Sequence, residues 1–158
     1  MRVDFYQVSR DPVPEIVTLL ARNTLKAGER LLVVAADPAQ LDAIGEALWR
    51  APPEESFLAN GRAAAGADEG GHDGAHEGAH DDRQPILLSE RPEPANGARY
   101  LALADGVWRE PEGFERVFLV FDSATLDGAR ACWRMLGERE GLERNFWRQE
   151  GGRWIRAA

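Results

Sequence analysis

The stretch EIVTLLARNTLKAGERLLVVAADPAQLDAIGEALW, residues 15–49, contains the helix–strand–helix pattern on which our prediction of the fold rests. Between residues 16 and 20 the apolar side chains recur with helical spacing, and Gly28 marks the end of that helix. The following run LLVVAA is unbroken and apolar, which is typical of a strand buried on both faces. Asp37 and Pro38 then provide a helix N-cap and a first helical residue.

The second helix of this stretch is expected to bury one apolar face and to end at the prolines that follow. That face comprises Leu41, Ile44, Leu48 and Trp49. Upstream, VDFYQV (residues 3–8) is rich in residues that favour strands. A strand–helix–strand–helix order with short connections predicts right-handed βαβ units and a parallel sheet.

The remainder of the chain extends the same pattern. Three further strands are predicted at PILLS (85–89), RYLALA (99–104) and ERVFLVFD (115–122), and a helix at about 124–140. The tail RNFWRQEGGRWIR (144–156) alternates around a Gly-Gly turn and predicts a terminal strand pair. We therefore expect one α/β domain over residues 1–158. It is three-layered and Rossmann-like, with a mostly parallel central sheet and a C-terminal strand pair.

Residues 59–84 have a different composition from the rest of the chain. The segment has six glycines and no Leu, Ile, Val or aromatic residue, so we interpret it as a mobile insert rich in Gly, His and Asp. His72, His76 and His80 are spaced four apart, but the intervening glycines disfavour the helix that would align them. A solvated repeat with weak metal affinity is favoured over a metal site, and we predict neither a metal nor another cofactor.

The chain has few residues from which an active site is usually built. Its predicted strand–helix turns contain neither GxGxxG nor GxxxxGK[ST], and all three histidines lie in the insert. The single cysteine, Cys132, lies in a predicted helix and is expected to be part of the hydrophobic core rather than a reactive thiol. No catalytic residue is therefore predicted. The opening MRVDFYQVSRDPVPE lacks the apolar run of a signal peptide, and we expect a cytoplasmic protein.

Charge is distributed unevenly along the chain. The formal net charge is −8, yet the residues from Arg130 onward contain seven arginines and four glutamates. Arg130 and Arg134 share one face of the predicted helix, with Trp133 beside them. These arginines either pair with Asp127 and Glu138 along the helix or form, with the indole, a pocket for a peptide that ends in a carboxylate. The residue pattern alone leaves both interpretations open.

Several segments together resemble a known family, the chi subunit of bacterial DNA polymerase III holoenzyme. They are VDFYQV, GERLLVVAAD, LDAIGEALWRAPPEESFLANG, QPILLS, GFERVFLVFD and, near the C-terminus, ARACWR followed by NFWRQEGGRW. The chain departs from the family pattern in having Ala59-Asn60 after the ESF motif, where Pro-His is common. It also has one additional residue between Trp133 and Trp147 and a longer insert.

The resemblance implies a non-catalytic adaptor with a Rossmann-like fold. Members of the family bind the acidic C-terminal tail of the single-stranded-DNA-binding protein and link it to the clamp-loader complex, through psi or another clamp-loader subunit. Transferred to this chain, the tail-binding residues are Arg130, Trp133, Arg134 and Leu119, and the residues facing psi are Phe57 and Leu58. Contact with nucleic acid would be indirect or weak. The rival hypothesis is a nucleotide-dependent or nucleic-acid-modifying enzyme on the same kind of sheet.

Overall fold

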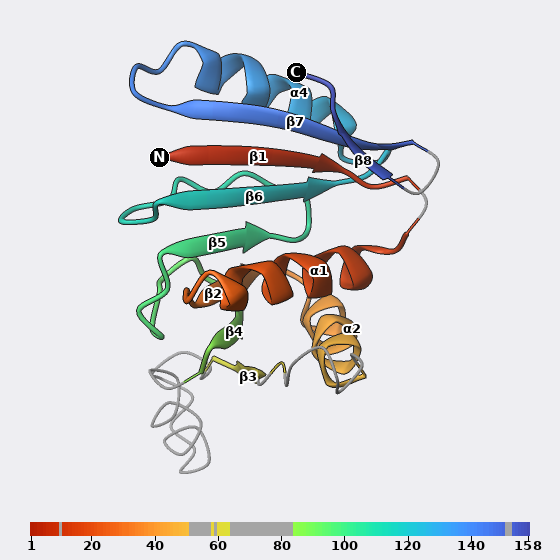
Figure 1. Ribbon diagram of the computed structural model, residues 1–158, viewed down its shortest axis with the longest axis vertical. Coiled ribbons are helices and arrows are strands. Elements are labelled where there is room, and N and C mark those ends of the chain that lie inside the picture. The colour runs from red at the N-terminus through yellow and green to blue at the C-terminus, as the bar shows by residue number, and fades with distance from the viewer. Residues whose placement is uncertain (10, 51–57, 59, 64–83, 151–152) are drawn as a thin grey trace.

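A single mixed sheet of eight strands forms the centre of the molecule, which we describe from a computed structural model (Figure 1). The structure describes residues 1–9, 11–50, 58, 60–63, 84–150 and 153–158. In chain order the elements are β1 (Arg2–Gln7), α1 (Val13–Lys26), β2 (Leu31–Val34), α2 (Pro38–Trp49), β3 (Asn60–Arg62), β4 (Ile86–Ser89), β5 (Tyr100–Leu103), β6 (Arg116–Phe121), α4 (Leu126–Gly137), β7 (Glu143–Glu150) and β8 (Arg153–Arg156).

The strand order across the sheet is β3-β4-β2-β5-β6-β1-β7-β8. Every neighbouring pair is parallel except β7 and β8, which are antiparallel. The predicted fold class is therefore confirmed, including the terminal strand pair. Because β1 lies between β6 and β7, the two ends of the chain pair within one sheet.

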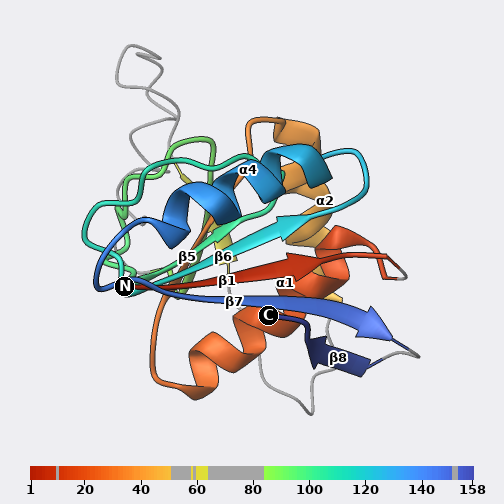
Figure 2. The same cartoon turned by 90° about the horizontal axis from the view of Figure 1, so that it is seen from above.

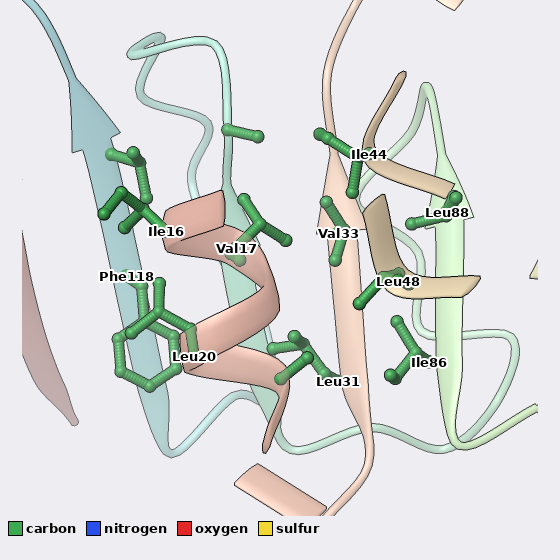
Figure 3. Packing of buried hydrophobic residues seen from close by; sticks show 14 of the residues in the cluster. Ile16, Val17, Leu20, Leu31, Val33, Ile44, Leu48, Ile86, Leu88 and Phe118 are labelled. Atoms are coloured by element: carbon green, nitrogen blue, oxygen red, sulfur yellow. The ribbon is translucent and has the colours of Figure 1, made fainter. Parts of the chain in front are cut away.

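Helices cover both faces of the sheet, which explains the apolar runs in the central strands. Helices α1 and α4 lie on opposite sides (Figure 2). The cluster on the α1 side includes Ile16, Leu20 and Phe118, and α2 adds Ile44 and Leu48 to it (Figure 3). The cluster under α4 includes alternate residues of the same strands. The strands LLVV and ILLS are buried at every position, as parallel strands between two helical layers must be.

Two local predictions differ from the structure. Trp49 was expected on the inner face of α2, but its side chain is 56% exposed, whereas Leu41, Ile44 and Leu48 are buried as predicted. Trp49 lies one helical step beyond Leu48, and that step of about 100° moves it off the stripe facing the sheet. The second difference is β3, which lies within the predicted insert and pairs in parallel with β4. Residues 64–83, which include the three histidines, lie outside the described residues.

Candidate functional site on helix α4

Helix α4 follows β6 directly, and side chains at the junction fix its start. The Oδ1 atom of Asp122 accepts hydrogen bonds from the backbone amides of Ala124 (2.9 Å) and Thr125 (3.2 Å). These bonds hold the turn between β6 and α4, which leads to Thr125, the N-cap residue of the helix. One side of α4 then packs on the sheet through Ala129, Cys132 and Leu136. The helix packs against β6 and β7 on the face of the sheet opposite α1, and its other side forms a fixed outer flank (Figure 2).

Cys132 belongs to the core, as predicted, and is 5% exposed. Burial, together with the negative charge of Glu110, raises the pKa of the Cys132 thiol to about 12. The thiol consequently stays protonated near neutral pH, which is the unreactive form.

Trp133 is half-buried at the border between α4 and β7. Its ring meets those of Phe5 and Phe146 edge to face, with centroid distances of 5.2 and 5.7 Å. The guanidinium of Arg144, from β7, lies over the indole with its central carbon 4.1 Å from the ring centroid. The indole is therefore held in place by the protein's own side chains, and Arg144 covers one of its faces.

Arg130 and Arg134 are exposed and lie on the same flank of α4 as Trp133. Within the described part of the chain, neither forms an ion pair, so of the two interpretations left open by the residue pattern, pairing with Asp127 and Glu138 is not the one present. Their guanidinium groups therefore face solvent without a carboxylate within 4.0 Å among those residues. This arrangement can bind an external anion without first breaking an internal ion pair.

Leu119 lies on β6, below α4, in the same apolar cluster that Trp133 packs against. Its exposed fraction is 0%, because the side chain points into the layer between sheet and helix. In this structure Leu119 supports the helix from below, and a partner would reach it only if the side chains above it moved.

Of the two residues expected to face psi, the structure describes Leu58. Phe57 lies outside the described residues. Leu58 is 2% exposed and packs in the cluster shared by α1 and α2. Among the residues that the structure describes in this region, Trp49, at the end of α2, is exposed. The helical periodicity of α2 contained the signal, since Leu41, Ile44, Gly45 and Leu48 already fill the buried stripe.

The carboxyl ends of the parallel strands, where an α/β enzyme would bind a nucleotide, are occupied by carboxylates with structural partners. Asp37 caps α2 by accepting from Ala39 N at 2.9 Å. Asp105 accepts from Ala36 N at 3.0 Å and forms two bonds with Arg109 at 2.8 and 2.9 Å. Burial would raise the pKa of Asp105, but the bonds from Arg109 and the backbone amides outweigh it and lower the pKa.

Asp37 and Asp105, at this edge of the sheet, therefore already have hydrogen-bond partners within the protein. Across the residues that the structure describes, no cluster of three or more His, Cys, Asp or Glu side chains has the arrangement of a metal site. The same residues contain no helix long and apolar enough to span a bilayer.

The model of the family described as DNA polymerase III chi subunit, HolC, matches residues 1–143. The chain belongs to that family. A comparison with curated proteins gave no match. The chi subunit is a non-catalytic accessory subunit of DNA polymerase III, so the chain is an accessory protein rather than an enzyme.

The family match extends through all three described helices and stops at the first residue of β7. Arg130, Trp133 and Arg134 lie inside the matched region. Most of β7 and all of β8, including Arg144, lie beyond it.

Proposed function

We propose that this chi-family protein binds the acidic C-terminal tail of the single-stranded-DNA-binding protein and links it to the clamp-loader complex. The observation that carries the proposal is the flank of α4. There, two exposed arginines without an ion-pair partner among the described residues lie beside the half-buried indole of Trp133. Arg130 binds the terminal carboxylate, Arg134 attracts the acidic residues, and the terminal phenyl ring packs beside the indole.

The expected affinity follows from these contacts. A hydrogen bond to a charged group contributes about 1.5–3 kcal/mol, and burial of a phenyl ring contributes about as much. Ordering the tail and joining two molecules offset a large part of this gain, so we expect a Kd in the micromolar range. The arginines are exposed, and added salt therefore weakens binding.

Fluorescence anisotropy with a labelled acidic peptide ending in Ile-Pro-Phe tests the proposal. Arg130→Ala should weaken binding by about tenfold or more, the equivalent of one lost charge-assisted hydrogen bond. Arg91→Ala is the matched control, because Arg91 is also exposed but follows β4, which lies near the opposite edge of the sheet from β7. If wild type and Arg130→Ala bind with equal affinity, the tail does not bind at this site.

For the link to the clamp loader we propose the region at the end of α2. The family resemblance implied Phe57 and Leu58 there, and the proposal is supported by Trp49, the last residue of α2, which is 56% exposed. A large exposed indole is typical of the apolar anchor of a protein interface. Trp49→Ala should reduce co-purification with clamp-loader subunits and leave tail-peptide binding unchanged. Full co-purification of this variant would exclude Trp49 from the interface.

A further inference from the structure

Arg144 occupies a position that the predictions from sequence did not identify. It is the second residue of β7, and its register partner on β1 is Val3, which belongs to the apolar cluster under α4. The Arg144 guanidinium lies over the Trp133 ring, and its Nη1 atom donates a hydrogen bond to the Trp133 carbonyl oxygen. A methyl group at Gly137 would approach the same guanidinium to 2.7 Å. Arg144 therefore fills the space between β7 and the last turn of α4.

The charge of Arg144 is poorly compensated for a half-buried side chain. In the described residues its only hydrogen-bond acceptor is the neutral carbonyl of Trp133, and no carboxylate lies within 4.0 Å of it. The neighbouring Glu143 side chain is oriented toward Arg2 instead, at 3.6 Å. By contrast, Arg109, with 18% of its side chain exposed, binds Asp105 through both terminal nitrogens.

A guanidinium has five N–H donors, and taking them partly out of water without an anion is unfavourable. Stacking on the indole and the negative end of α4 recover part of this cost. Because a carboxylate would satisfy the remaining donors, the environment of Arg144 is that of an anion site whose acceptor comes from outside the chain.

The spacing along α4 defines which anion fits. Arg130 precedes Trp133 by three residues, and Gly137, beneath the Arg144 guanidinium, follows it by four, all on one flank. The seven residue-to-residue steps from Arg130 to Gly137 rise about 10 Å along the helix. An extended peptide covers about 10 Å in three residues, which is the separation between an acidic residue placed directly before Ile-Pro-Phe and the terminal phenylalanine.

We propose that Arg144 is a second anion-binding residue of the tail site. It pairs with the side chain of the acidic residue three positions before the terminal phenylalanine, while Arg130 holds the terminal carboxylate. Trp133 lies between the two cations and contacts the apolar residues of the tail. This inference rests on the proposed function of α4, and it makes Arg144, together with Arg134, a residue that favours acidic tails over neutral ones.

The test compares three peptides, each measured by anisotropy against each protein. One ends in Asp-Asp-Asp-Ile-Pro-Phe, the second has Asn in place of each Asp, and the third is the acidic peptide with an amidated C-terminus. The proteins are wild type, Arg144→Gln, Arg144→Lys, Arg130→Ala and, as control, Arg91→Gln. Thermal unfolding of each variant verifies that it is folded at the assay temperature.

We expect Arg144→Gln to weaken binding of the acidic peptide by about tenfold and to leave binding of the Asn peptide unchanged. Arg144→Lys should recover part of the affinity for the acidic peptide. The amidated peptide has no terminal carboxylate for Arg130 to bind. Arg130→Ala should therefore bind this peptide with the same affinity as wild type. Equal weakening of the acidic and Asn peptides by Arg144→Gln would mean that Arg144 only positions the indole, and no weakening would remove it from the site. Either result overturns this inference alone. Absence of acidic-peptide binding to wild type would overturn the proposed function as well.

Discussion

Substituting Asp4 by Asn should cause a large loss of stability, because Asp4 is a carboxylate with 0% exposure inside the sheet. Its Oδ1 atom accepts hydrogen bonds from Asn145 Nδ2 and Trp147 Nε1, both at 3.1 Å. Its Oδ2 atom pairs with Arg116 Nε at 2.9 Å and with Arg2 Nε at 3.2 Å. One side chain thus connects the three neighbouring strands β6, β1 and β7.

The magnitude follows from what the substitution leaves behind. An asparagine has one carbonyl oxygen, and an NH2 group replaces the second carboxylate oxygen. This NH2 group faces N–H donors that previously had an acceptor. The partly buried Arg116 also loses its counter-charge. Breaking a buried ion pair from one side costs about 3–5 kcal/mol. For a domain of this size that corresponds to a decrease in Tm of roughly 6–20 °C.

Urea unfolding followed by tryptophan fluorescence measures this change in the free energy of unfolding. The matched control is Asp42→Asn, because Asp42 also pairs with an arginine, Arg62, but 70% of its side chain is exposed. A pair of that kind contributes less than about 1 kcal/mol. If the Asp4 and Asp42 variants lose similar amounts of stability, the network around Asp4 does not stabilise the fold as we infer.

Two further predictions concern Tyr6 and two glycines. Burial, followed by the negative charge of Asp4, raises the pKa of Tyr6 to about 12, above its ordinary value of 10.0. The unfolded chain therefore loses this proton first as pH rises, so stability should fall from about pH 10 upward. Tyr6→Phe should show a shallower fall in urea unfolding between pH 8 and pH 11, and identical slopes would contradict this reasoning. Gly106 and Gly113 both have positive φ, at 73° and 80°. A Cβ on Gly106 would lie 2.5 Å from Thr125 Oγ1, whereas one on Gly113 would have nothing within 4 Å. Gly106→Ala should therefore lower the Tm more than Gly113→Ala, and the reverse order would show that the Thr125 contact is relieved without cost.

The residue pattern was sufficient for the architecture because the signals involved are local. Continuous apolar runs such as LLVV form strands that are buried on both faces, and the strand–helix alternation requires parallel crossovers. Asp37 caps α2 from within its own turn, as its position before Pro38 predicts. The burial of Cys132 follows in the same way from helical periodicity.

The candidate site was predictable only in part, for the same reason. The shared flank of Arg130, Trp133 and Arg134 follows from helical spacing, and the structure places all three there. Whether Asp127 and Glu138 would neutralise these arginines depends on side-chain geometry, and sequence reasoning left that question open. The burial of Leu119 depends on how α4 lies across β6, which no local pattern encodes.

What the sequence determined by itself is therefore the chain order of the helices and of the strands other than β3, the cap of α2 and most of the apolar faces, each of which depends on neighbours within a few residues. Only the tertiary structure brought Asp4 to Arg116, Asn145 and Trp147, across separations of 112, 141 and 143 residues. Only it laid Arg144 over Trp133. Such contacts arise when strands distant in the chain pair side by side, and whether a charge is compensated depends on partners that this pairing supplies.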